Sequence, residues 1–72
     1  MTKLTPDEIA NLRELGYMVS SKEGQTFVEN DTHVFEEDFG HWYMYGKAQD
    51  CFAYIDEFET VFSAIDYSKD LL

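Results

Sequence analysis

Apolar positions near the start of the chain recur at helical spacing, at Ile9, Leu12 and Leu15. The residues before them are typical of a helix start, since Thr5 can cap the first turn and Pro6 suits the first helical position. Thr5 and Glu8 also have the spacing of a capping box. Gly16 is a common residue just after a helix. The pattern therefore predicts a short helix over residues 6–15.

Apolar and polar residues then alternate with the short period of β-strands. The predicted strands span residues 17–20, 26–29, 32–35 and 41–45. Gly24 lies in a polar run that predicts a hairpin turn, and residues 30–31 signal a second turn. Residues 36–40 are expected to form a loop, and Gly46 is expected to end the last strand. Three or four antiparallel strands result.

A helical period returns towards the C-terminal end, where apolar residues fall on one face at about 100° per residue. These residues are Cys51, Tyr54, Ile55, Phe58, Val61, Phe62 and Ile65. With Asp50 as the N-cap, the pattern predicts a helix over residues 51–67. We expect one compact α+β domain over residues 1–72, in which an N-terminal helix, an antiparallel sheet and a C-terminal helix follow one another. The C-terminal helix should pack on one face of the sheet.

The composition is that of a folded but strongly acidic domain. Apolar residues make up 44% of the chain, enough for a core, while five basic residues face fifteen acidic ones and give a net charge of -10. This charge disfavours direct contact with nucleic acid or anionic membranes. It favours a basic protein or a nucleoprotein complex as partner, although acidity also serves solubility.

Cysteine content and hydropathy bear on location. Cys51 is the only cysteine, so no internal disulfide can form. No secretory signal is recognisable, and no apolar stretch reaches the roughly 20 residues that a membrane span requires. We therefore expect a cytoplasmic protein.

Candidate catalytic and metal-binding residues are few. Cys51 with His33 or His41 is the only nucleophile and base to consider, and Cys51 is expected on the buried face of a helix, as a small hydrophobe. His33 and His41 could face each other across a hairpin beside an acidic loop, but their spacing matches no zinc motif. Neither an EF-hand nor a glycine-rich phosphate loop is present. We predict no enzyme activity, no metal and no cofactor.

The acidic residues are concentrated in two segments. Residues 29–46 contain no Lys or Arg, and their acids are Glu29, Asp31, Glu36, Glu37 and Asp38. On the predicted last helix, Asp56, Glu59 and Asp66 fall opposite the apolar stripe. Like charges held together destabilise a fold, which suggests that they have a use. Both acidic segments are therefore predicted to bind a partner.

Aromatic residues are more numerous than one small core needs. Trp42 and Met44 are expected in the core. Tyr43, Tyr45 and Tyr54 are in excess, and such residues often anchor protein interfaces. Tyr43 and Tyr45 therefore join the predicted partner-binding residues.

In size, element order and acidic patches, the chain resembles small acidic proteins by which bacteriophages block host defences, such as anti-CRISPR and anti-restriction proteins. The patches are residues 29–38 and 56–66, and no sequence motif is involved, so no functional residue is transferred. The resemblance implies a stoichiometric inhibitor that occupies a nucleic-acid-binding site, in the cytoplasm of a bacterial host. The alternative is a small structural or regulatory subunit that forms a homodimer, or docks, through its aromatic surface.

Overall fold

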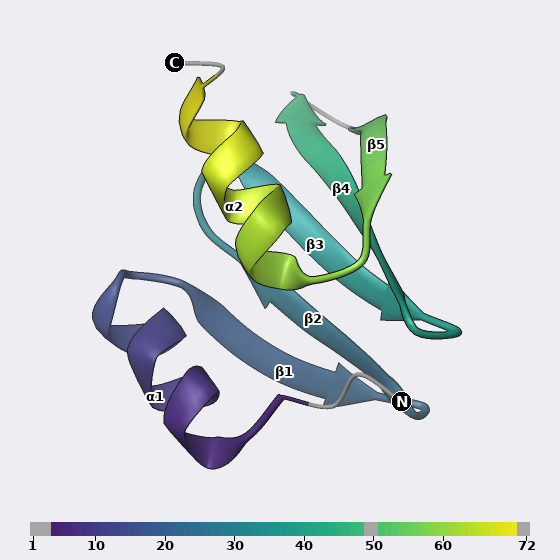
Figure 1. Cartoon of the computed structure of the whole chain (residues 1–72). Helices are drawn as coiled ribbons and strands as arrows, with labels where there is room; N and C mark the ends of the chain where they lie inside the picture. Colours follow the sequence, from purple (N-terminus) through teal and green to yellow (C-terminus); the bar gives the residue numbers. More distant parts are fainter. Residues whose placement is uncertain (1–3, 49–50, 71–72) are drawn as a thin grey trace.

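The computed structural model of the chain describes residues 4–48 and 51–70. Within them, two helices and five strands follow in the order α1 (Pro6–Glu14), β1 (Met18–Lys22), β2 (Gln25–Glu29), β3 (His33–Asp38), β4 (His41–Ala48), β5 (Cys51–Phe58) and α2 (Val61–Asp70). Each strand pairs antiparallel with the next one in the chain (Figure 1). The predicted α+β class with an antiparallel sheet is confirmed, but the sheet has five strands rather than three or four.

Helix α1 begins where the sequence predicts, because the capping box forms. The Thr5 Oγ1 atom accepts a hydrogen bond from Glu8 N at 3.2 Å, and Glu8 Oε1 accepts one from Thr5 N at 2.8 Å. The helix ends before Gly16, which has a φ of +96°. Local residues thus define both ends of α1.

Tight turns join the first four strands. Glu23–Gly24 and Phe39–Gly40 have positive φ at both positions, as two-residue hairpin turns of type I′ require. Between β2 and β3, the Asn30 side chain closes the predicted turn, since its Oδ1 atom accepts from Thr32 N at 2.9 Å and from His33 N at 2.8 Å.

The expected loop over residues 36–40 is wrong, because β3 continues to Asp38 and only Phe39 and Gly40 form the turn. Glu36 and Glu37 belong to the ladder with β4. The expected strand end at Gly46 is also wrong. Strand β4 runs through Gly46 to Ala48, and Gly46 pairs with Ala53 of β5.

The predicted helix over residues 51–67 is wrong in its first part, where β5 forms the edge of the sheet. The pairing of β4 with β5 contains a β-bulge that shifts the register by one residue. Tyr45 pairs with Tyr54, whereas Met44 pairs with Asp56. The extra residue in β5 is Ile55. As a result, Ile55 and Phe58 both pack against the core at a spacing of three residues, which imitates a helical period.

Helix α2 starts only after β5 has ended. Thr60 precedes it, and its Oγ1 atom accepts a hydrogen bond from Ser63 N at 3.1 Å, the contact of an N-cap. The predicted N-cap, Asp50, lies outside the described residues. None of the helices within residues 4–48 and 51–70 is long and apolar enough to cross a membrane.

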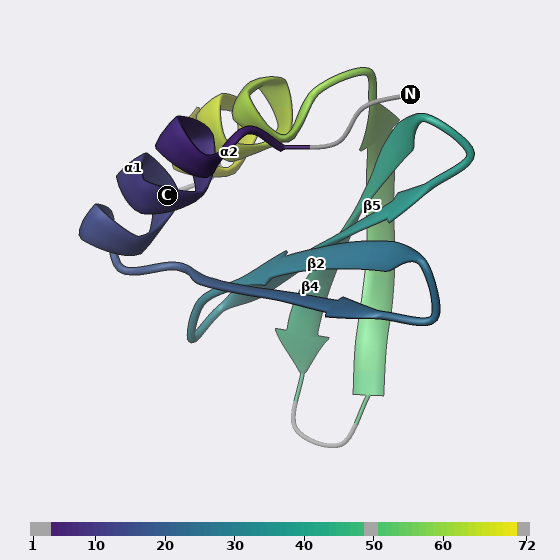
Figure 2. The same ribbon diagram turned by 90° about the horizontal axis from the view of Figure 1, so that it is seen from below.

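Both helices lie over the same face of the twisted sheet (Figure 2). Their buried residues join those of the strands in one cluster of Leu12, Val28, Phe35, Trp42, Met44, Val61, Ala64 and Ile65. Val28, Phe35 and Met44 form a row across β2, β3 and β4, and each is 0% exposed. Trp42 and Met44 are thus core residues, as predicted. The opposite face of the sheet has no helix over it among the described residues.

Candidate functional site

Alternate residues of every strand point away from the helices. We call this side of the sheet the open face, and its central residues are Ser20, Phe27, Glu29, Val34, Glu36, Asp38, Tyr43, Tyr45, Phe52, Tyr54 and Glu57. The strand register sets their order. One row across all five strands consists of Ser20, Phe27, Glu36, Tyr43 and Glu57. The open face therefore interleaves aromatic rings with carboxylates.

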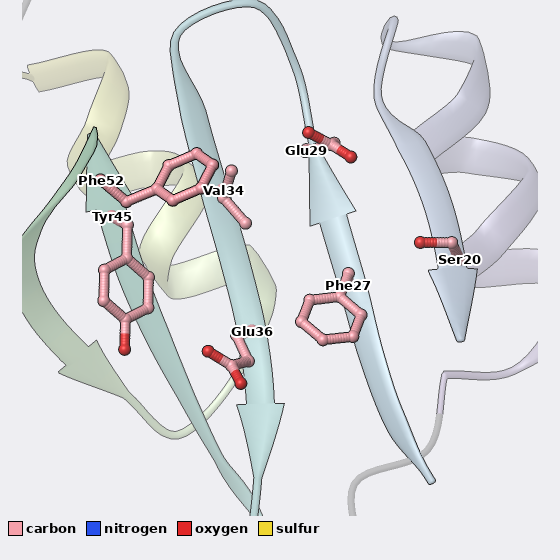
Figure 3. Close-up of a pocket in the computed structure, with 7 residues that line it drawn as sticks. All are labelled: Ser20, Phe27, Glu29, Val34, Glu36, Tyr45 and Phe52. Atoms are coloured by element: carbon pink, nitrogen blue, oxygen red, sulfur yellow. The ribbon is translucent and has the colours of Figure 1, made fainter. Parts of the chain in front are cut away.

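A pocket of about 470 Å³ lies on the open face. Figure 3 shows the seven residues that line it, which are Ser20, Phe27, Glu29, Val34, Glu36, Tyr45 and Phe52. They come from all five strands, and the helices lie behind the sheet in this view. Apolar side chains supply most of the lining, and two glutamates supply its negative charge. The pocket is therefore suited to a ligand with an apolar body and a positive end.

Tyr54 brings the other tyrosines of the open face into one cluster. Its ring centroid lies 5.7 Å from that of Tyr45 and 6.4 Å from that of Tyr43, at interplanar angles of 65° and 46°. These are favourable geometries for aromatic pairs. The Tyr54 side chain is 56% exposed. The three tyrosines that the sequence predicted to be in excess of the core thus lie together on the surface.

Carboxylates surround this cluster and oppose the ionisation of its phenols. Partial desolvation raises the pKa of Tyr45, and the charges of Glu36 and Asp38 raise it further. Desolvation, Glu57 and Asp56 likewise raise the pKa of Tyr54. The potential at the phenol hydroxyls is therefore negative, which favours the approach of a cation.

Two of the open-face carboxylates have a basic neighbour. Lys47 Nζ lies 2.9 Å from Glu29 Oε2, with the two side chains 31% and 34% exposed, so Glu29 is paired by a lysine just beyond the predicted cation-free segment. His41 Nδ1 lies 3.6 Å from Glu57 Oε2, an ion pair only when His41 is protonated. Within the described residues, no ion pair involves Glu36 or Asp38. Among the described residues, Glu36 and Asp38 thus carry charge without a basic partner, and Glu57 does so whenever His41 is neutral.

The remaining predicted acids lie elsewhere. Glu37 pairs with Trp42, on the face towards the helices, and its Oε2 atom accepts from Gly40 N at 3.0 Å. Asp31 lies in a turn and Asp66 on α2. The predicted acidic face of the last helix is wrong, because Asp56 belongs to β5 and Glu59 precedes α2. Among the predicted partner-binding residues, the open face gathers Glu29, Glu36, Asp38, Tyr43 and Tyr45.

Sequence reasoning did not assign partner binding to Phe27, Phe52 or Glu57, and it gave Tyr54 such a role only in the alternative of an aromatic docking surface. Phe27 lies next to the buried Val28 in β2, and the alternation of side chains along a strand was the available signal for it. For β5 the signal was lost, because the segment looked helical.

The predicted catalytic and metal candidates do not come together. His33 pairs with Gly46 and His41 pairs with Asp38, so the histidines lie at opposite ends of the β3–β4 ladder. Cys51 is exposed at the start of β5, contrary to the expectation that a helix buries it. The described part of the chain contains no group of three or more side chains placed to hold a metal ion.

No protein-family model, curated protein or solved structure matches the chain. Functional proposals therefore rest on the chemistry of the open face. Its carboxylates accept hydrogen bonds and attract cations, and its rings offer flat apolar and π surfaces. This combination is suited to recognition of a positively charged partner surface.

Proposed function

We propose that the protein is a non-catalytic binding protein whose open face docks on a basic surface of a protein or nucleoprotein partner. The observation that supports this is the placement of Tyr43, Tyr45 and Tyr54 beside Glu36 and Asp38, on a sheet face that neither helix of the described chain covers. Tyrosines are enriched among the residues that dominate interface energies. Carboxylates near them add specificity and speed the encounter with a basic partner.

In its finer form, the proposal is that this basic surface normally holds nucleic acid. The protein would then be an inhibitor of the anti-CRISPR or anti-restriction kind, acting in the cytoplasm of a bacterial host. Support comes from the net charge of -10 and from the uncompensated carboxylates Glu36 and Asp38. Phosphate-binding surfaces are rich in Lys and Arg, so carboxylates held on a sheet can compete for them.

Affinity capture from a bacterial lysate, followed by competition, tests both levels of the proposal. We expect the immobilised protein to retain a basic protein or nucleoprotein, and added DNA or RNA to displace it. Added salt should weaken the complex, because exposed charges are screened. Failure to capture a basic partner, or capture that salt leaves unchanged, contradicts docking by charge. Salt-sensitive capture that nucleic acid leaves intact contradicts only the mimicry.

A charge-matched pair of variants locates the contact. Glu36→Gln with Asp38→Asn removes two charges from the open face, and Asp66→Asn with Asp70→Asn removes two from the exposed surface of α2. We expect the first double variant to weaken capture by at least about tenfold and the second to change it little. Equal losses would mean that only the total charge matters.

A second candidate function is a structural or regulatory subunit that dimerises or docks through aromatic contacts. The observation in its favour is the exposure of Phe52 (64%) and Tyr54 on the edge strand β5. Edge strands present unpaired backbone groups to which another chain can add. This alternative predicts association that persists at high salt and is lost in Phe52→Ala with Tyr54→Ala, as measured by analytical ultracentrifugation. A monomer at all salt concentrations argues against the homodimer.

A further inference from the structure

Glu36 lies between aromatic residues of neighbouring strands. It pairs with Phe27 on β2 and with Tyr43 on β4. Tyr45 lies two residues after Tyr43 in β4 and therefore on the same face of the sheet. Figure 3 shows Glu36, Phe27 and Tyr45 on the same side of the sheet. Glu36 is half-buried and lines the pocket. The Glu36 carboxylate thus lies among aromatic side chains and is partly shielded from solvent.

The pocket's two carboxylates differ in what they can bind. Glu29 already has Lys47 at 2.9 Å, whereas none of the ion pairs in the described residues involves Glu36. The charge of Glu36 is felt by the nearby Tyr45 hydroxyl, whose pKa it helps to raise. A cation supplied from outside the chain would therefore be bound best at Glu36.

The neighbours of Glu36 favour one kind of cation. A guanidinium group is flat, weakly hydrated and able to stack on an aromatic ring while its N–H groups donate to a carboxylate in a bidentate pair. An ammonium group is compact and strongly hydrated, so it loses more hydration free energy than a guanidinium group when it enters a pocket with apolar walls. Val34 and Phe52 offer apolar surface along which an arginine stem can lie.

We propose that this pocket binds an arginine side chain of the protein partner, with the guanidinium group on Glu36 and against an aromatic ring, and that it prefers arginine to lysine. The inference rests on the proposed docking of the open face on a basic partner and names the residue that is recognised. The pocket is an open depression in a sheet, so a side chain projecting from an extended segment can enter it. Arginine at the interface would then carry specificity that overall charge does not provide.

Peptides of equal length test this preference on the whole protein, and the arginine and lysine peptides also carry equal charge. The probes are an Arg-Gly repeat, a Lys-Gly repeat and a citrulline-Gly repeat, in which the guanidinium is replaced by a neutral urea of the same shape. We expect the arginine peptide to bind about five to ten times more tightly than the lysine peptide, and the citrulline peptide not to bind measurably. An NMR titration should shift the ring signals of Phe27 and Tyr45.

Two variants separate charge from stacking. Glu36→Gln should lower the affinity for the arginine peptide by about tenfold or more. Asp66→Asn makes the same change of charge on α2 and should have little effect on this affinity. Tyr45→Leu keeps an apolar wall but removes the ring. This substitution should lower the affinity for the arginine peptide while leaving the affinity for the lysine peptide nearly unchanged. The ratio of the two affinities should therefore fall towards one. The NMR spectrum of each free variant shows whether it is folded.

The outcomes distinguish this inference from the proposed function. If both cationic peptides bind equally and lose affinity together in salt, the arginine preference is wrong, whereas docking on a basic surface stands. If the arginine peptide binds but shifts residues of α2 rather than the open face, the pocket assignment is wrong. If the arginine peptide binds in the pocket while no basic partner is captured from lysate, the inference survives and the proposed function fails.

Discussion

The two faces of the sheet are built from the same strands but differ in how deeply their side chains are buried. On the face towards the helices, Val28, Phe35 and Met44 are fully buried. On the open face of the same strands, Phe27 and Tyr45 are half-buried. Burial of apolar area is the main favourable term in folding, so the covered face holds the domain together. The open face keeps part of the area of its rings accessible beside carboxylates, so those rings contribute less to folding than the fully buried side chains do.

The largest expected effect comes from truncating the covered face. Phe35→Ala should lower the free energy of unfolding by about 3–5 kcal/mol, because it removes a fully buried ring and leaves a cavity. A domain of this size has only about 4–11 kcal/mol in total. Phe52→Ala, where the ring is exposed on the open face, should cost less than about 0.5 kcal/mol. Urea unfolding followed by circular dichroism measures both.

The same two variants can also contradict the contrast between the two faces. If Phe52→Ala destabilised the protein as much as Phe35→Ala, the open face would be part of the folding core. Its aromatic rings would then need no partner to explain them.

A smaller effect, of opposite sign, is expected at the turn between β3 and β4. Phe39 has a φ of +50° and is 93% exposed, so it combines an unfavourable backbone conformation with an exposed ring. Asn tolerates this conformation, and Asn-Gly is a preferred sequence for the turn. Phe39→Asn should therefore raise the free energy of unfolding by about 1 kcal/mol.

Glu23→Asn is the matched control, since Glu23 has a φ of +53° in the equivalent turn between β1 and β2. A similar gain is expected, measured by thermal or urea unfolding. Should Phe39→Asn instead destabilise the fold while Glu23→Asn stabilises it, Phe39 would have a packing role that its exposure does not suggest.

Local signals in the sequence predicted the parts of the fold that depend on neighbouring residues. The capping box of Thr5 and Glu8 and the turn at Asn30 appear as predicted, because their hydrogen bonds join residues two or three positions apart. The β5 segment was misassigned because its bulge places Ile55 and Phe58 on one side at helical spacing. Only pairing with β4 defines it as a strand.

The candidate site was predicted in part for a related reason. Composition indicated surplus tyrosines and acids, but the side of the sheet on which each lies depends on strand register. Thus Glu36 and Glu37, adjacent in sequence, lie on opposite faces. The ion pair of Lys47 with Glu29 joins residues of different strands, and the pattern along the chain did not reveal it.

The smallest effect concerns the phenols of the open face and vanishes at neutral pH. The pKa of Tyr45 is raised by desolvation, Glu36 and Asp38 above its ordinary value of 10.0, so around and above pH 10 the folded protein binds more protons than the unfolded chain. The folded protein therefore loses stability as the pH rises from about 10 through the folded pKa, and this loss is absent well below pH 10, where the phenols are protonated in both states. The raised pKa of Tyr54 acts in the same direction.

Tyr45→Phe with Tyr54→Phe should remove that part of the alkaline decline, because neither ring then has a proton to lose. Urea midpoints measured below and above pH 10 give the slope of stability against pH for the unchanged protein and for the double variant. At neutral pH this pair of substitutions should change stability little, since the rings remain. An unchanged alkaline slope in the double variant would mean that the carboxylates of the open face do not act on its tyrosines, and would remove the electrostatic part of the contrast between the two faces.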